Sequence, residues 1–205
     1  VDITTGNPSD QPWTLARGGA AAVWGTARLV DCRLYDNHAQ GDFDSSRDRG
    51  AFGGAVYADI VEMERCIVSG NTVTGGGAAG GGVYSVGGAE SAKTMSTIDR
   101  SAVTGNRISG LFTYGAGVYS DGGGIGKSKL LRITNSTLAR NLAEPAPSLP
   151  RFLLAMGYWL GGGVYLSNGH LEMQACTVVE NEVRGAPRTD SLGRRNLAGG
   201  VTTIQ

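Results

Sequence analysis

The stretches Gly81-Gly82-Val83-Tyr84 and Gly162-Gly163-Val164-Tyr165 are two copies of a phrase that recurs along this chain. Each copy is followed downstream by a short segment that ends in asparagine, such as Ser101-Ala-Val-Thr-Gly-Asn106. The repeated asparagines lie 34, 35, 35 and 40 residues apart, at Asn37, Asn71, Asn106, Asn141 and Asn181. A repeat with this period predicts one supersecondary unit stacked on copies of itself, which is a solenoid.

The repeated unit has the pattern of strands. Apolar residues alternate with mixed residues on a period of two in each half of the repeat. Glycines before each valine would cost a helix about 1 kcal/mol apiece, so a helical repeat is set aside. A third strand is expected in each unit, as in Leu130-Leu131-Arg132-Ile133. Three short strands per turn, closed by corners, predict an all-β, single-stranded parallel β-helix of about five complete coils, with variable loops at one corner.

Equivalent side chains of adjacent coils should stack, because neighbouring strands lie about 4.8 Å apart in register. A column of valines is predicted to face inward, at Val23, Val56, Val83, Val118, Val164 and Val201. The asparagines are predicted to form a structural ladder at a corner. Each amide would bond its neighbour and the turn backbone, and asparagine tolerates the left-handed conformation of a bend.

Composition fits a thin cylinder better than a thick globular core, since 205 residues include 34 glycines and only 7% aromatic residues. We expect one domain over residues 1–205. Its repeats should span about 17–40, 50–74, 79–108, 114–143 and 160–183, followed by a partial coil at 197–205. The formal net charge of zero argues against nucleic acid or an anionic membrane as partner. No stretch is long and apolar enough to span a bilayer.

The paired phrases resemble the repeats of polymorphic outer-membrane-protein-type and related right-handed parallel β-helix proteins. The family's first motif, Gly-Gly-aliphatic-Tyr, matches at 54–57, 81–84 and 162–165, and loosely at 21–24 and 116–119. Its second motif, Phe-x-x-Asn, is altered, with Leu or Val in place of Phe at 34, 68, 103, 138 and 178. The resemblance covers residues 17–202 and implies a right-handed coil. It is much less specific for function, because such helices serve adhesins, autotransporter passengers, wall proteins and polysaccharide-cleaving enzymes.

No catalytic cluster is predicted. His38 and His170 lie in different repeats at different points of the coil. Asp59 and Asp121 are separated by Val86 in the intervening coil, so they should not adjoin. Asp31, Glu64 and Asp99 spread over another edge without an obvious basic partner. The three cysteines, Cys32, Cys66 and Cys176, share a slot with Ser101 and Ser136 and are predicted to be buried, unpaired core residues.

One loop carries oxygen-bearing side chains at alternate positions, as calcium loops do. These are Asp42, Asp44 and Asp48, together with Ser46. Arg47 stands where such a loop needs glycine, and no glutamate follows at the last position. We therefore interpret the stretch as a solvated acidic turn, with calcium as the alternative and no other cofactor predicted.

An aromatic column is expected next to the valine column, on the opposite face of the strand. Its members are Trp24, Tyr57, Tyr84, Tyr119 and Tyr165. An exposed column at this spacing would stack on sugar rings or dock a partner sheet. The alternatives are that loops cover the column or that it points inward.

The longest loop, 142–161, contains an apolar cluster that should not stay in water. Its members are Phe152, Leu154, Met156, Tyr158 and Trp159. The cluster is predicted to bind a partner, with packing along the flank of the same molecule as the alternative. The chain starts at Val1 and stops one strand into a new coil, so we expect a fragment that continues into further coils or associates through its open C-terminal coil.

These patterns predict a non-catalytic scaffold or adhesin module, extracellular or at the cell surface, that binds a protein or glycan partner. The absence of a convergent acid–base or metal cluster is the reason. Two alternatives are kept: a polysaccharide-active lyase or glycosidase, and a structural subunit of a larger assembly. A cluster of carboxylates with a cation on one sheet would favour the enzyme.

Overall fold

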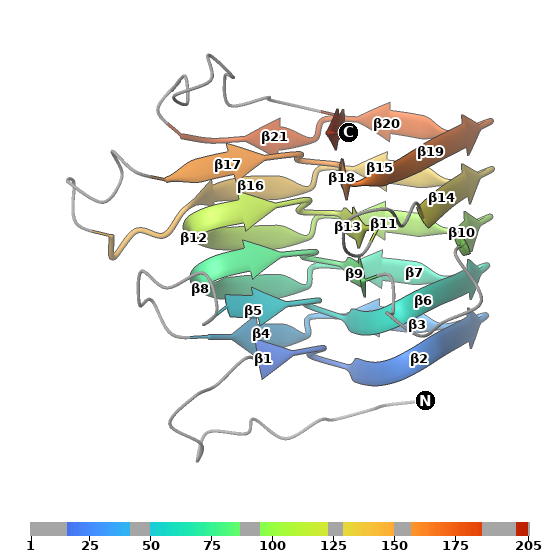
Figure 1. Cartoon of the computed structure of the whole chain (residues 1–205), viewed down its shortest axis with the longest axis horizontal. Coiled ribbons are helices and arrows are strands. Elements are labelled where there is room, and N and C mark those ends of the chain that lie inside the picture. The colour runs from blue at the N-terminus through green and yellow to red at the C-terminus, as the bar shows by residue number, and fades with distance from the viewer. Residues whose placement is uncertain are drawn as a thin grey trace.

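The computed structural model describes residues 16–41, 50–86, 95–122, 129–149, 157–185 and 200–204. Over these residues the chain is all-β and contains no helix. The strands lie in tiers that rise in chain order from the N-terminal to the C-terminal end (Figure 1). They form three sheets, which we call A, B and C, and every described strand pairing is parallel.

Sheet A contains eight strands. These are β1 (Ala16–Arg17), β4 (His38–Gln40), β5 (Gly50–Phe52), β8 (Thr72–Ala79), β12 (Arg107–Tyr114), β16 (Leu142–Pro145), β17 (Tyr158–Leu160) and β21 (Glu182–Val183). Sheet B contains nine strands. These are β2 (Ala21–Val30), β6 (Val56–Glu64), β9 (Val83–Val86), β10 (Met95–Asp99), β13 (Val118–Asp121), β14 (Lys129–Thr134), β18 (Val164–Ser167), β19 (Gly169–Gln174) and β22 (Val201–Ile204). Sheet C contains β3 (Arg33–Tyr35), β7 (Ile67–Ser69), β11 (Ala102–Thr104), β15 (Thr137–Ala139) and β20 (Thr177–Val179).

Strands pair with their equivalents one sequence repeat away. In sheet C, Val103 pairs with Val68 on one side and with Leu138 on the other. In sheet B, Val118 pairs with both Val83 and Val164. Residues one repeat apart in the sequence therefore lie on neighbouring, hydrogen-bonded strands. As a result, similar side chains stack on one another.

Every repeat bends at residues with positive φ. One set of bends separates sheet B from sheet C, at Asp31, Arg65, Arg100, Asn135 and Ala175. A second set separates sheet C from sheet A, at Asp36, Gly70, Gly105, Arg140 and Glu180. The third set, between sheets A and B, consists of Gly18, Gly53, Gly80, Gly115 and Gly161. Only the third set consists entirely of glycine. At Gly81, the residue after the bend glycine Gly80, a Cβ would collide with the Ala116 carbonyl of the following repeat. Close approach of successive repeats thus explains the Gly-Gly-Val phrase.

The core lies between the three sheets. Val56, Val83, Val118 and Val164 are buried, as predicted for the valine column. They pack in one cluster with residues of sheet C such as Val68 and Val103. The outward positions Arg33 and Ile67 of the same sheet C strands are exposed, so the period of two correctly separated the faces.

The predicted asparagine ladder is confirmed. Asn71 donates from its side-chain amide to Oδ1 of Asn106 at 2.9 Å and to the Leu34 carbonyl at 3.0 Å. The backbone N–H of Asn71 donates to the same Oδ1 at 3.1 Å. This pattern repeats from Asn106 to Asn141 and from Asn141 to Asn181. The left-handed residue is the one before each asparagine and not the asparagine itself, because the amide must point inward to reach its neighbours.

The loop insertions do not leave from one corner, and that part of the prediction is wrong. In sheet A, β4 and β5 both pair with the continuous strand β8, and β16 and β17 both pair with β12. In sheet B, β9 and β10 both pair with β6. Insertions therefore interrupt strands at two places in the repeat, because both halves of a broken strand still pair with an unbroken neighbour.

The first repeat is also shifted relative to the predicted alignment. Ala21 pairs with Val56 and Ala22 with Tyr57, whereas the sequence pattern had aligned Val23 and Trp24 with these residues. The register shifts between Val23 and Thr26, where β2 carries one extra residue at Gly25. A β-bulge of this kind lets the strand resume its pairing further on.

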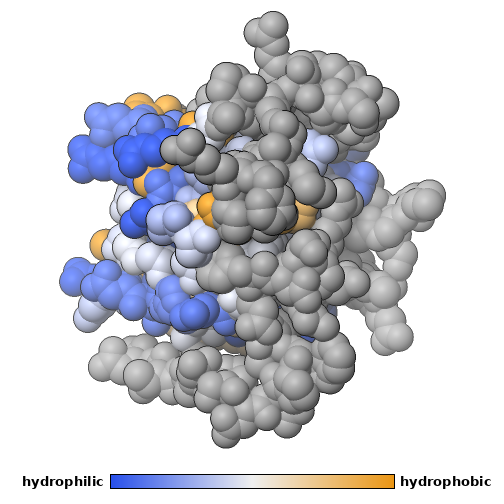
Figure 2. Space-filling model, turned by 90° about the vertical axis from the view of Figure 1, so that its left-hand side faces the viewer, coloured by the Kyte–Doolittle hydropathy of each residue, from blue (hydrophilic) through white to orange (hydrophobic). Residues whose placement is uncertain are grey.

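No helix within the described residues is long and apolar enough to cross a membrane. Figure 2 shows one face of the molecule, on which hydrophilic residues in blue gather along one side with small hydrophobic spots among them. Among the described residues, the large hydrophobic side chains that remain exposed lie on strands of sheets B and C. They are Trp24, Val30, Tyr35, Ile67, Met95, Val179 and Val201.

Replacing Asn106 with leucine should destabilise the protein by roughly 3 kcal/mol, because Asn71 would lose a buried acceptor and the Val68 carbonyl a donor. Denaturant unfolding measures the loss. Asn37→Leu is the matched control, since this terminal rung donates to Asn71 but receives no described bond on its own Oδ1. The control should lose clearly less stability, and equal losses would contradict the ladder.

Candidate functional site

The outer face of sheet B carries two parallel rows of residues, all of them polar or charged except Val30. The first row is Arg28, Glu62, Thr97, Arg132 and Glu172, in register from strand to strand. The second row is Val30, Glu64, Asp99, Thr134 and Gln174. The inward residues between the rows, such as Met63 and Ile98, are buried in the core. Strand alternation therefore places charge on this face and apolar residues beneath it.

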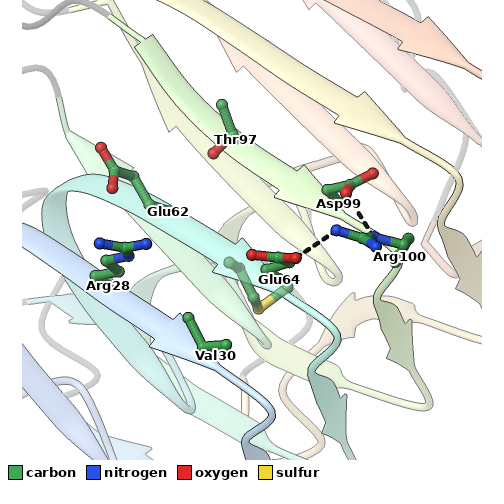
Figure 3. A pocket seen from close by; sticks show the side chains of 8 residues that line it. Arg28, Val30, Glu62, Glu64, Thr97, Asp99 and Arg100 are labelled. Carbon is green, nitrogen blue, oxygen red and sulfur yellow. Dashed lines mark hydrogen bonds and ion pairs between the residues drawn. The ribbon is translucent and has the colours of Figure 1, made fainter.

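A pocket of about 250 Å³ opens on this face over β2, β6 and β10 (Figure 3). It is lined by Arg28, Val30, Glu62, Met63, Glu64, Thr97, Asp99 and Arg100. Two of these side chains are cationic and three are anionic. The lining offers guanidinium donors, carboxylate acceptors and one hydroxyl, and its apolar members are Val30 and Met63.

Ion pairs hold one side of the pocket. Arg100 bridges Glu64 and Asp99, the two carboxylates that neighbour each other across β6 and β10. Arg65, next to the pocket, bonds both Glu64 and Asp31, and its two bonds to the Asp31 carboxylate measure 2.6 and 2.7 Å. The expectation that Asp31, Glu64 and Asp99 lack basic partners is therefore wrong. The expectation failed because Arg65 and Arg100 occupy the bend positions, which directly follow the outward residues Glu64 and Asp99 in the chain.

The electrostatics of this edge favour ionised carboxylates. Hydrogen bonds from the Thr134 hydroxyl at 2.6 Å and the Asn135 amide at 3.1 Å, together with Arg100, hold the pKa of Asp99 below its usual range. The hydrogen bonds from Arg65 lower the pKa of Asp31 in the same way. A glycosidase needs one carboxyl group whose pKa is raised so that it can donate a proton. These two carboxylates are shifted in the opposite direction.

The aromatic column forms, but most of it is buried. Tyr57, Tyr84, Tyr119 and Tyr165 stack face to face, with ring centroids 4.7–5.6 Å apart. Tyr57, Tyr84 and Tyr165 are at most 9% exposed. The prediction of an exposed strip is therefore wrong for these three residues, although their position opposite the valines is right. Burial accordingly raises the pKa of Tyr57, Tyr84 and Tyr119.

The covering groups are aromatic side chains of sheet A, which pack on tyrosines of their own or the next repeat. Phe52 packs on Tyr84, and Tyr114 packs on both Tyr119 and Tyr165, with ring centroids 5.0–6.2 Å apart. Phe52 and Tyr114 each stand five residues before the tyrosine of their own repeat, just before the glycine corner. That spacing was visible in the sequence. The sharp glycine bend brings the outer faces of sheets A and B together, which the pattern alone did not show.

Trp24 behaves differently from the tyrosines. It is 68% exposed and lies edge-on to Tyr57 at the N-terminal end of the column, with ring centroids 5.3 Å apart. The Arg17 guanidinium lies 4.7 Å from the Trp24 ring and 5.2 Å from the Tyr57 ring. This cation–π contact closes the end of the stack.

The structure describes only two members of the predicted partner-binding cluster, Tyr158 and Trp159. Phe152, Leu154 and Met156 lie outside the described residues. Trp159 is fully buried, and its indole N–H donates to the Gly110 carbonyl at 3.1 Å, so its assignment to a partner contact is wrong. The reason is that β17 joins sheet A beside β12, where alternation turns Trp159 inward. Tyr158, on the other face, is half-buried and stacks on Phe112 at 5.9 Å.

The three cysteines are free, as predicted, but only Cys66 is fully buried. Cys32 and Cys176, in the first and last complete repeats, are partly exposed. The shared Cys/Ser slot works as a second ladder, in which the Cys66 N–H donates to Ser101 Oγ and the Ser101 N–H donates to Ser136 Oγ, each at 3.0 Å. Burial raises the pKa of the Cys66 thiol.

No group of His, Cys, Asp or Glu within the described residues could hold a metal ion. The calcium alternative involves Asp42, Asp44 and Asp48, which lie outside the described residues.

Sequence reasoning missed a buried lysine inside the core. Lys129 is 1% exposed, and its ammonium group donates to the Asp59 carbonyl at 2.7 Å and to the Ser85 hydroxyl. Ser85 Oγ in turn lies 2.9 Å from Ser96 Oγ. Burial lowers the pKa of Lys129 to about 8, although the nearby charges of Asp59 and Asp121 act in the opposite direction. The only signal in the sequence was the pair of serines at apolar positions of the repeat.

Comparisons of the chain with protein-family models, with curated proteins and with solved structures found no match. The functional conclusions therefore rest on the geometry of the molecule.

Replacing Lys129 with methionine removes the buried amine and keeps most of its volume. The pKa of Lys129 in the folded protein lies below its ordinary value of 10.5. Between pH 8 and 10.5 the unfolded chain therefore binds more protons at Lys129 than the folded protein does. The contribution of Lys129 to stability consequently rises with pH over this range. From about pH 7 to about pH 9.5, wild type should gain roughly 2 kcal/mol of unfolding free energy relative to Lys129→Met. Parallel pH dependences of the two proteins, measured by denaturant unfolding, would rule out the buried amine.

Proposed function

We propose that the chain is a right-handed, single-stranded parallel β-helix that serves as a non-catalytic scaffold or adhesin module, extracellular or at the cell surface. In-register parallel pairing at one repeat and left-handed bends in every repeat support the β-helix. Right-handedness is supported by the general rule for crossovers between parallel strands. The Gly-Gly-Val-Tyr repeats support the same architecture through their resemblance to surface β-helix proteins.

The pocket over β2, β6 and β10 carries the functional proposal. Its lining is polar and nearly balanced in charge, which favours neither an anion nor a cation strongly. A hydroxyl-rich, uncharged ligand suits such a lining, because a hydroxyl can both donate to a carboxylate and accept from a guanidinium. We therefore infer that the pocket binds an uncharged glycan. A protein partner on the same face is the second possibility.

A polysaccharide-active enzyme is the main alternative. The observation that favours it is the neighbouring pair Glu64 and Asp99 with Arg100 between them. The lowered pKa of Asp99 argues against a general acid at that position. The ion pairs with Glu64 and Asp99 also occupy Arg100, one of the two arginines in the pocket that could meet a substrate carboxylate. Binding without turnover is the better-supported function.

The test is a screen of uncharged and acidic glycans against the purified protein, followed by calorimetry on any ligand found. Glu62→Ala should weaken binding by at least about tenfold, because it removes an acceptor from the pocket. Glu172→Ala is the matched control: it lies in the same outward row but outside the pocket, and binding should be unchanged.

Two results would overturn the proposal. If no uncharged glycan binds, or if Glu172→Ala weakens binding as much as Glu62→Ala, the pocket is not the site. If mass spectrometry shows that a bound glycan is shortened or unsaturated after incubation, the module is an enzyme.

A further inference from the structure

Two of the three cysteines occupy consecutive rungs of the Cys/Ser ladder, which consists of Cys32, Cys66, Ser101, Ser136 and Cys176. Cys32 directly precedes β3 and Cys66 directly precedes β7, and these two strands pair in register. The strands lie side by side in Figure 1. Two serine rungs separate Cys66 from Cys176. The proximity of the first two thiols therefore follows from strand pairing inside the stack.

The backbone at these two positions is suited to a disulfide. Neighbouring paired strands lie about 4.8 Å apart, and the Cα atoms of a disulfide lie about 4.4–6.8 Å apart. The backbone N–H of Cys32 donates to the sulfur of Cys66 at 3.4 Å, so that sulfur already points at the neighbouring rung. Rotation of the Cys32 side chain, with a small closing movement of the two Cβ atoms, brings the second sulfur within bonding distance.

Little hydrogen bonding is lost when the two thiols are joined. Each S–H donates to the carbonyl two residues earlier, Cys32 to Val30 and Cys66 to Glu64, both at 3.2 Å. Thiols are weak donors. The stronger bond of this part of the ladder, from the Cys66 N–H to Ser101 Oγ at 3.0 Å, is made by the backbone and remains. The register of the repeats is therefore compatible with the oxidised pair.

We propose that Cys32 and Cys66 are a modification site, at which oxidation forms a reversible disulfide between two adjacent repeats. The oxidant is the disulfide of a small thiol, such as oxidised glutathione. The inference does not depend on the glycan pocket. An extracellular or cell-surface location, as proposed above, would keep the bond formed, because disulfides persist in oxidising compartments.

The oxidation proceeds by two thiol–disulfide exchanges. Burial raises the pKa of the Cys66 thiol, which makes Cys66 a poor first nucleophile, and the exchange begins at Cys32. The Cys32 thiolate attacks the small disulfide, forms a mixed disulfide and releases one small thiolate. The Cys66 thiolate then attacks the Cys32 sulfur and releases the second small thiolate. The two protons of the cysteines pass to the released thiolates, so that two cysteine thiols are oxidised while one external disulfide is reduced to two thiols.

The bond fixes one repeat to the next. Cys32 and Cys66 are 34 residues apart, and the segment between them contains β3, β4, β5 and β6. A cross-link restricts the unfolded chain and thereby favours the folded state. For a loop of this length, the unfolding equilibrium constant should fall by roughly a hundredfold.

The test exposes the folded, reduced full chain to oxidised glutathione and counts the remaining thiols by alkylation in denaturant and mass spectrometry. Of the three thiols, only that of Cys176 should remain, and all three should return after treatment with dithiothreitol. Trypsin should release residues 29–33 linked to residues 66–93, because each of these segments ends in Arg or Lys and follows an arginine. Denaturant titration of the oxidised and reduced proteins measures the gain in stability.

A rearranged ladder is the matched control. The double variant Cys66→Ser, Ser101→Cys keeps the composition of the ladder but places the introduced thiol two rungs from both Cys32 and Cys176. Two rungs span about 10 Å, which is beyond the limit of about 7 Å for a disulfide. This variant should keep all its thiols under conditions that oxidise wild type. Cys176→Ser should form the bond as wild type does.

The proposal fails on any of four results. The first is that wild type keeps all three thiols or forms only glutathione adducts. The second is that disulfide-linked dimers form in place of the internal bond. The third is that the double variant is oxidised to the same extent as wild type. The fourth is that the oxidised and reduced proteins have equal stability.

Discussion

The asparagine ladder fixes where each repeat ends, because one amide group binds both the next repeat and the carbonyl of a strand in the preceding repeat. Asn106, for example, accepts two bonds from Asn71 and donates to Asn141 and to the Val68 carbonyl. Its polar groups are thereby satisfied where water is excluded. A shift of one residue would break these bonds and turn the valine columns outward. Register, burial and the bends therefore depend on one another.

The surface features follow from this register. Because equivalent residues lie side by side, charges at outward positions form rows, and arginines at the bends meet the carboxylates of the adjoining repeat. The pocket of sheet B is a gap between two such rows. The pocket and the charged rows around it thus have one structural origin, the in-register pairing of equivalent residues.

The strands, the inward valines and the ladder could be predicted, because each depends on contacts between equivalent residues one repeat apart. The bulge at Gly25 could not, since Val23-Trp24 imitates Val56-Tyr57 in composition. The burial of Tyr84 depends on Phe52 and on the angle of a glycine corner, and the period of the repeat does not specify that angle. The basic partners of Glu64, Arg65 and Arg100, could not be predicted from strand alternation, because they occupy bends and not strands. Lys129 was missed because it stands at an inward position and is satisfied by a carbonyl group two repeats away.

The most direct test of one-repeat pairing is to delete a whole unit. Removing residues 106–140 joins Gly105 to Asn141 and lets Asn71 stack directly on Asn141, since 35 residues separate ladder partners here. Removing only 106–122 cuts the unit in half and leaves the register broken. The account predicts that the 35-residue deletion unfolds cooperatively with a β-sheet circular dichroism spectrum, at reduced stability, while the half-unit deletion does not fold. Equal loss of structure in the two proteins, measured side by side by circular dichroism and denaturant titration, would contradict it.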